Sequence, residues 1–127
     1  MARILIAEDE DSLRSLVQRA LVLDGHEVAV APDGAEALDM LGSREGGFDL
    51  LLADIKMPVM DGIALALAAA RDHPDLIVLL MTGYADQRER AHGLDALVHD
   101  VITKPFTLPE IRQAVAGALA AGARQAQ

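Results

Sequence analysis

Residues 50–53 read Leu-Leu-Leu-Ala with no polar residue among them, and the run ends on Asp54. A strand with one solvated face alternates polar and apolar residues, whereas a continuously apolar run is typical of a strand covered on both faces, as in a parallel sheet. Pro58 and the Asp61-Gly62 pair then end the extended pattern. The chain must therefore bury this strand between two layers, and an acid at its exposed end indicates a site.

The rest of the chain alternates between short apolar runs and helical spacing. Strands are predicted at residues 3–7, 27–31, 49–54, 76–81 and 97–103. Helices are predicted from residue 13 to a stop at Gly25, at 33–41, 61–70 and 86–94, and from Thr107 to Leu119. This alternation predicts an α/β fold, a doubly wound parallel sheet of five strands. Five strands favour the flavodoxin-like order 2-1-3-4-5.

Two helix starts carry capping signals. Asp33 with Glu36 forms an acidic version of the capping box, and Thr107 with Glu110 forms the usual one. The helix at 86–94 is marginal, because it contains Gly93 and few apolar residues. The segment 122–127 is expected to be a frayed tail.

Length and composition limit the classes of function. The 127 residues fit one domain, expected to span 1–122 with a short tail at 123–127 and no output domain. A net charge of −9 without a basic cluster disfavours binding to nucleic acid or to an anionic membrane. The chain has no cysteine, no signal-peptide pattern and no apolar run long enough to cross a bilayer, so we expect a soluble cytoplasmic protein.

Chemically active side chains stand at the carboxyl ends of four predicted strands. They are Glu8 and Asp9 after the first strand, Asp54 at the end of the third, Thr82 after the fourth and Lys104 after the fifth. In a sheet of this topology these ends form the ligand crevice, so the five side chains should converge. Glu8 and Asp9 alone would be interpreted as helix caps; the joint pattern indicates a site.

Three carboxylates packed together raise one another's pKa unless a cation lies between them. A hard divalent ion with oxygen ligands, Mg²⁺ by default and Mn²⁺ as a substitute, meets that requirement. We hypothesise that Asp54 is a nucleophile that attacks phosphorus and becomes an acyl phosphate. In that scheme Asp9 and Asp54 hold the metal, with Glu8 acting through water, and Lys104 and Thr82 hold the remaining phosphoryl oxygens.

The two lysines of the chain, Lys56 and Lys104, both fall within this predicted site, whereas the other cationic residues are arginines. A compact ammonium group serves as a point charge where a planar guanidinium would be bulkier. Pro105 follows Lys104 and is expected to fix the loop that aims it, as a cis peptide.

The combined motifs resemble those of the CheY-like receiver domain of two-component response regulators. The resemblance covers essentially the whole chain and rests on Ala7-Glu8-Asp9, the segment 54–62, Met81-Thr82-Gly83 and Lys104-Pro105-Phe106.

This resemblance implies a role for each matching residue. Asp54 would be the phosphoacceptor, Glu8 and Asp9 the metal-binding acids, and the backbone carbonyl of Lys56 a further metal ligand. Thr82 and Lys104 would form the switch pair. A receiver of this kind catalyses only its own phosphorylation and dephosphorylation, and is otherwise not an enzyme.

Within the family, the segments 4–10, 82–85 and 102–106 are similar to the CpdR-type cell-cycle regulators of alphaproteobacteria. That similarity implies a single-domain regulator that receives phosphate from a histidine kinase or histidine phosphotransferase and signals by docking to a protein effector. It further implies docking to the ClpXP protease machinery and control of regulated proteolysis.

One position departs from the family pattern. Three residues before Lys104, where many receivers carry a switch aromatic, this chain has Val101. Tyr84, two residues after Thr82, is a candidate to act as the mobile group instead. Lys56 and Tyr84 flank the site, so they are candidates for setting the phosphoryl lifetime.

Other functions remain open at this stage. A phosphatase of the haloacid dehalogenase type needs a second acid two residues after the nucleophile, where this chain has Lys56. A flavodoxin needs a hydroxyl and glycine loop after the first strand, where residues 8–11 are all acidic. A phosphate sink in a phosphorelay and an unphosphorylated pseudo-receiver that only binds partners are the remaining alternatives.

Overall fold

The computed structural model describes residues 2–43, 47–83, 93 and 96–125. The strands are β1 (Arg3–Ala7), β2 (Glu27–Ala31), β3 (Leu50–Asp54), β4 (Ile77–Thr82) and β5 (Asp100–Thr103). The helices are α1 (Asp11–Leu23), α2 (Gly34–Ser43), α3 (Gly62–Asp72) and α5 (Leu108–Gln125). The helix predicted at 86–94 lies outside the described residues, apart from Gly93.

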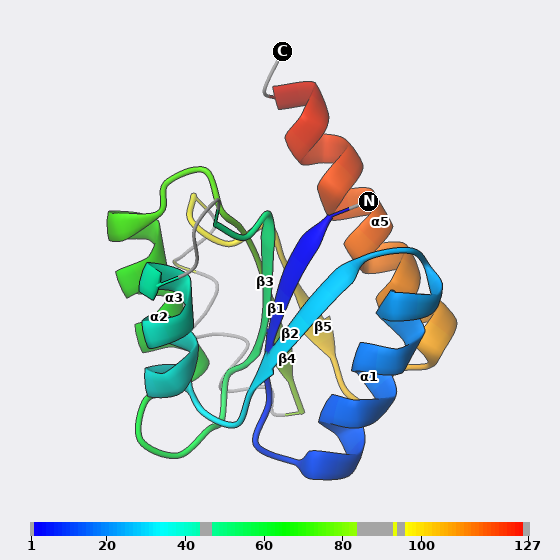
Figure 1. The fold of residues 1–127 in the computed structure, drawn as a ribbon, viewed down its shortest axis with the longest axis horizontal. Helices are drawn as coiled ribbons and strands as arrows, with labels where there is room; N and C mark the ends of the chain where they lie inside the picture. The colour runs from blue at the N-terminus through cyan, green and yellow to red at the C-terminus, as the bar shows by residue number, and fades with distance from the viewer. Residues whose placement is uncertain (1, 44–46, 84–92, 94–95, 126–127) are drawn as a thin grey trace.

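The five strands form one parallel sheet in the order β2-β1-β3-β4-β5, which confirms the predicted fold class and strand order. Helices α1 and α5 cover one face of the sheet, and α2 and α3 cover the other (Figure 1). Because all five strands are parallel, their carboxyl ends lie at the same edge of the sheet, where α1 begins.

Strand β3 lies at the centre and is buried along its whole length. Because side chains alternate along a strand, its residues divide between two cores. Leu51 and Ala53 pack with residues of α2 and α3, while Leu50 and Leu52 pack with residues of α1 and α5. The apolar run thus contributes side chains to the cores on both faces of the sheet, as its lack of alternating polar residues predicted.

The predicted capping boxes are both present. The Glu36 backbone N–H donates to Asp33 Oδ1 at 2.8 Å. At α5 the bonding is reciprocal, since the Thr107 N–H donates to Glu110 Oε1 at 3.0 Å and the Glu110 N–H donates to Thr107 Oγ1 at 3.3 Å. These caps hold two helix starts that lie beside the carboxyl edge of the sheet.

Four strand boundaries differ from the prediction, and two of these are starts one residue later than expected, at Leu50 and Ile77. Strand β5 begins at Asp100 rather than at residue 97, because a turn at residues 96–97 delays its pairing with β4. Val98 is buried in the core, so its apolar character reflects packing and not a place in the sheet. Strand β4 continues to Thr82, whose carbonyl accepts the Lys104 N–H at 2.7 Å.

The C-terminal segment was predicted wrongly as a tail beginning at residue 122. Helix α5 continues to Gln125, with Gly122 inside it, and its last turns extend past the sheet at the top of Figure 1. Alanine is the best helix former, so Ala120, Ala121 and Ala123 offset the cost of one glycine, about 1 kcal/mol.

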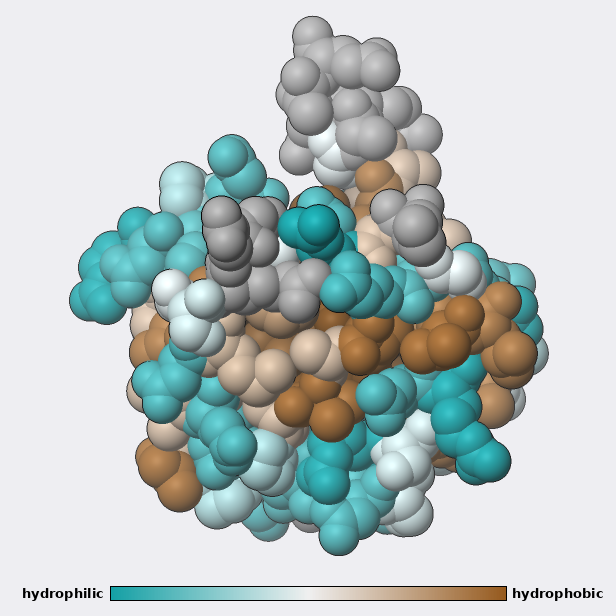
Figure 2. Space-filling model, in the orientation of Figure 1, coloured by the Kyte–Doolittle hydropathy of each residue, from teal (hydrophilic) through white to brown (hydrophobic). Residues whose placement is uncertain are grey.

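The outer edge of β2 lies on the face drawn in Figure 2. Hydrophobic side chains gather across the middle of that face, where β2 runs in Figure 1. The three central residues of β2 are half-buried, and Val22 and Leu23 at the end of α1 are exposed.

Among the described helices, none is both long and apolar enough to cross a membrane.

Candidate functional site

The structure brings the predicted side chains together at the carboxyl edge of the sheet. Glu8 directly follows β1 and is tied to β2, because its N–H donates to the Ala31 carbonyl at 3.1 Å. Asp54 ends β3 and pairs in register with Met81, so Thr82 stands one residue further along the neighbouring strand. Glu8, Asp54 and Thr82 are the buried polar or charged residues of the described chain.

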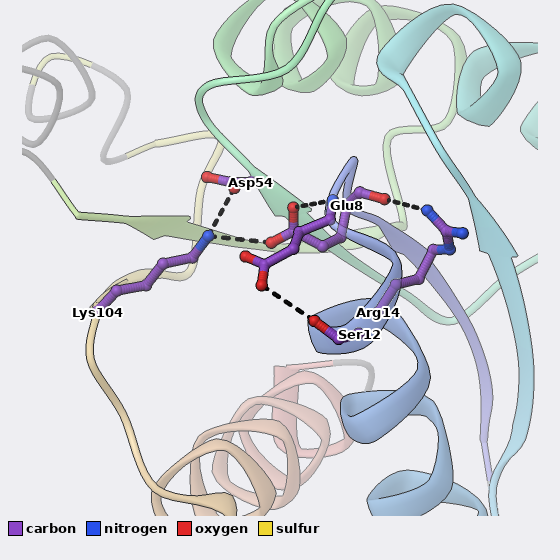
Figure 3. Close-up of polar contacts among 6 residues, drawn as sticks. Glu8, Ser12, Arg14, Asp54 and Lys104 are labelled. Atoms are coloured by element: carbon purple, nitrogen blue, oxygen red, sulfur yellow. Dashed lines mark hydrogen bonds and ion pairs between the residues drawn. The ribbon is translucent and has the colours of Figure 1, made fainter.

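Lys104 connects the two buried acids. Its Nζ lies 2.6 Å from Asp54 Oδ2 and 3.0 Å from Glu8 Oε1, and its side chain reaches between them from the end of β5 (Figure 3). Burial acts to lower the pKa of Lys104, but the hydrogen bonds and charges of Asp54 and Glu8 outweigh burial and raise the pKa. The ammonium is therefore firmly charged in the resting protein.

The pKa of the Glu8 carboxyl is raised well above its ordinary value. Burial raises its pKa from 4.5 to about 7, while hydrogen bonds from the Glu10 N–H and from Lys104 act in the opposite direction. A hydrogen bond with Asp9 and the neighbouring charge of Asp54 also raise the pKa, as smaller causes. The expectation that neighbouring carboxylates raise one another's pKa therefore holds in direction for Glu8, while removal from water is the larger cause.

A divalent cation fits the acids present. One carboxylate oxygen from each of Glu8, Asp9 and Asp54 lies within 4.8 Å of the others. Opposite ligands of Mg²⁺ stand about 4.2 Å apart, twice its usual distance to oxygen, so a small adjustment would bring all three into its reach. Asp9 is exposed while the other two acids are buried, which leaves one open side for ligands from solvent.

The remaining predicted residues lie around this cluster. Lys56 is an exposed residue of the loop between β3 and α3. The Lys104–Pro105 peptide bond is cis, as predicted. Val101 is half-buried in β5, pairs in register with Leu80 and packs against the core shared with α2 and α3. Tyr84 lies outside the described residues.

Arg14 is a site residue that the sequence motifs did not predict. Its Nη1 donates to the Glu8 carbonyl at 2.9 Å (Figure 3). Its other terminal nitrogen pairs with Asp11 at 2.5 Å. Arg14 thereby fixes the backbone that carries Glu8 and Asp9. An arginine at helical spacing three residues after an acid, directly behind an acidic strand end, was the signal available. Glu10, the N-cap of α1, makes no side-chain capping hydrogen bond, and its N–H donates to Glu8 Oε2 at 3.1 Å.

Residues 4–116 match the family model described as the response regulator receiver domain. The chain belongs to the response regulator receiver domain family. Receivers accept phosphoryl groups in two-component signalling and bind Mg²⁺ through acidic residues, which agrees with the cluster at the carboxyl edge. The family inferred from the sequence motifs is confirmed.

Curated relatives and solved structures both support this assignment. The receiver is 38% identical over 109 residues to response regulator MprA of Mycobacterium avium, an alignment that covers 86% of this chain and 47% of the relative. The chain thus spans about half the length of the curated relatives it matches.

Solved receiver structures share the fold. The CheY-like receiver domain protein of Methanospirillum hungatei has 27% identity and a TM-score of 0.89, with 98% of each chain covered. The response regulator TrrA of Thermotoga maritima, solved in complex with Mg²⁺-BeF, has 29% identity and a TM-score of 0.81, covering 93% of this chain and 99% of that one. These relatives do not distinguish a CpdR-type receiver from others, so that subgroup stays a prediction.

Proposed function

We propose that this receiver accepts a phosphoryl group on Asp54 from a histidine kinase or histidine phosphotransferase and signals by docking to a protein effector. The observation that carries the proposal is the position of Asp54, buried at a strand end, 2.6 Å from the Lys104 ammonium and within reach of a cation shared with Glu8 and Asp9. Phosphoryl transfer depends mostly on positioning and charge, and this arrangement supplies both.

The transfer is a simple exchange of bonds. An oxygen of Asp54 attacks phosphorus, the bond from phosphorus to the donor histidine nitrogen breaks, and the histidine leaves with its electron pair while Asp54 becomes an acyl phosphate. The acids Glu8, Asp9 and Asp54, with the carbonyl of Lys56, would hold Mg²⁺ or Mn²⁺. The cation would neutralise the phosphoryl oxygens when bound.

Lys104 must change partners during this step. Its Nζ contacts the Asp54 oxygen Oδ2 in the resting protein. When Asp54 gains a phosphoryl group, the ammonium can follow the negative charge onto a phosphoryl oxygen while staying near Glu8. We propose that Thr82 holds a second phosphoryl oxygen, so that Thr82 and Lys104 report the phosphorylated state through β4 and β5.

The signal would leave through Thr82, Tyr84 and the β5 surface, with the small Val101 in place of a switch aromatic. A CpdR-type receiver would then control proteolysis by docking to the ClpXP protease machinery. The receiver would catalyse only its own phosphorylation and dephosphorylation, with Lys56 and Tyr84 setting the phosphoryl lifetime.

Intact mass tests acceptance directly. Incubation of the wild type with acetyl phosphate and Mg²⁺ should add the mass of one phosphoryl group, and chelation of the metal should prevent it. Asp54→Asn should remain unmodified, while Asp100→Asn, at the opposite edge of the sheet, should behave as the wild type. A wild type that gains no phosphoryl group would favour the pseudo-receiver that binds partners without modification.

A phosphate sink differs from a signalling receiver in its output. A sink returns phosphate to the relay or to water without an effector whose binding depends on phosphorylation. Pull-down from lysate with the phosphorylated protein and with Asp54→Asn as matched baits distinguishes the two. Identical bound proteins in both states would argue against the docking proposal, while leaving phosphoryl acceptance intact.

A further inference from the structure

The loop that joins Asp54 to α3 is pinned at both ends. The Ile55 N–H donates to the Met81 carbonyl at 2.9 Å, and the Gly62 N–H closes the loop by donating to the Ile55 carbonyl at 2.8 Å. Met57 is buried in the core shared with α2 and α3. The carbonyl of Lys56, the proposed metal ligand, therefore sits in a segment whose path is largely fixed.

Val59 has the one positive φ among the described non-glycine residues, 69°. The Met60 N–H donates to the Pro58 carbonyl at 2.7 Å, so these residues form a tight three-residue turn. A β-branched residue is strained in this region of backbone space. Val59 is 84% exposed and gains little from packing, so contacts elsewhere must hold the turn.

Gly34, the first residue of α2, supplies such a contact. It is buried, and a Cβ built on it would lie 3.0 Å from both the carbonyl carbon and the Cβ of Met60, and closer still to the carbonyl oxygen. Real Cβ atoms essentially never approach other atoms that closely, and a backbone carbonyl cannot rotate aside as a flexible side chain can. The backbone of α2 at Gly34 is thus in close contact with the Pro58–Met60 turn.

We propose that Gly34 is a positioning residue for phosphoryl transfer, because its bare backbone seats the Pro58–Met60 turn and thereby sets the loop between Asp54 and Gly62. A larger residue at position 34 displaces Met60 and, through the pinned chain, the carbonyl of Lys56. Small displacements of groups that hold reacting atoms cost rate steeply. The chemical consequence rests on the proposed function, whereas the seating of the loop does not.

The chain offers a matched control on the same helix. Gly42 also lies in α2, and a Cβ built on it meets nothing within 4 Å. Gly34→Ala and Gly42→Ala therefore make the same chemical change on one helix, but only the first is directed at the Asp54 loop. A general effect of alanine on α2 would appear in both variants.

Two measurements test the proposal. Amide hydrogen exchange by NMR should show that Gly34→Ala speeds exchange of the Met60 and Gly62 amides at least tenfold, with the Ile4 and Ile6 amides of β1 unchanged, and that Gly42→Ala speeds neither. Phosphorylation by acetyl phosphate and Mg²⁺ should slow at least tenfold in Gly34→Ala alone. Unchanged loop amides in Gly34→Ala would overturn the proposal.

The two arms separate the two hypotheses. A wild type that takes no phosphoryl group ends the proposed function, while the amide comparison still decides whether Gly34 seats the loop. If Gly34→Ala does not fold, the double variant with Val59→Gly decides, because glycine at the positive φ lets the turn yield to the new methyl group. Recovery of the fold in the double variant supports the proposal, and failure to recover overturns it.

Discussion

The ammonium group of Lys104 contacts both Glu8 and Asp54, two acids that are almost completely buried. The side chains of Glu8 and Asp54 are 1% and 8% exposed, and that of Lys104 is 24% exposed. Removing one partner of a buried ion pair is costly because the other charge stays buried without compensation. Lys104 therefore stabilises the resting site, and the same ammonium competes with any cation that the acids bind.

Replacing Lys104 should separate these two effects. Lys104→Met removes the competing positive charge, so Mg²⁺ should bind several-fold more tightly, while phosphorylation by acetyl phosphate slows at least tenfold because a phosphoryl oxygen loses its partner. Calorimetric Mg²⁺ titration and intact mass measure the two quantities. Arg71→Met, an exposed change on α3, should alter neither. Weaker Mg²⁺ binding in Lys104→Met would show that Lys104 supports the metal site instead of competing with it.

At the scale of elements, the helices show which contacts sequence alone could predict. The capping boxes at Asp33 and Thr107 were predictable because both partners lie within four residues. The contact between α1 and α5 was not, since Arg112 and Asp24 are 88 residues apart. The extra turn of α5 was missed because a local rule for glycine as a stop competed with the alanines on either side of it.

The Arg112–Asp24 pair links the end of α1 to the first half of α5. Arg112 Nε lies 3.0 Å from Asp24 Oδ1, and this hydrogen bond is the main cause that lowers the pKa of Asp24 below 3.8. A lowered carboxyl pKa contributes stability that is present above the unfolded value of 3.8 and is lost as pH falls through the folded value.

Arg112→Gln should therefore lower the Tm at pH 7, and its difference from the wild type should shrink as pH falls below 3.8. The effect is small, because the pair is accessible to solvent. Thermal unfolding at pH 7, 5 and 3 checks the expectation, with Arg19→Gln, an exposed change on α1, as the control. A difference that grows as the solution becomes more acidic would contradict the account of this pair.

For the whole molecule, the sequence was most informative where one pattern had a single physical solution. The apolar run at β3 required a parallel sheet covered on both faces, and the strand ends then brought Glu8, Asp54 and Lys104 to one edge. What remained hidden were a close approach between distant backbones and a side-chain contact with a backbone carbonyl. Gly34 against Met60 and Arg14 on the Glu8 carbonyl depend on side-chain volume and direction, which a linear pattern does not contain.

A cation that binds the folded acids should stabilise the entire fold. At a Mg²⁺ concentration ten times its Kd the gain is about 1.4 kcal/mol, which corresponds to a rise in Tm of about 5 °C for a domain of this size. Thermal scans with Mg²⁺ and with chelator measure it. Asp9→Asn should abolish the rise, and Asp39→Asn, an exposed acid of α2, should retain it. An undiminished rise in Asp9→Asn would place the cation elsewhere.

The central claim is that Asp54 itself carries the phosphoryl group. The most direct test is to phosphorylate the wild type with acetyl phosphate and Mg²⁺, reduce the acyl phosphate with borohydride, and map the modified residue by peptide mass spectrometry. The account predicts one reduced residue, at position 54, that disappears when the metal is chelated. Reduction at Glu8, Asp9 or another carboxylate, with Asp54 intact, would contradict it.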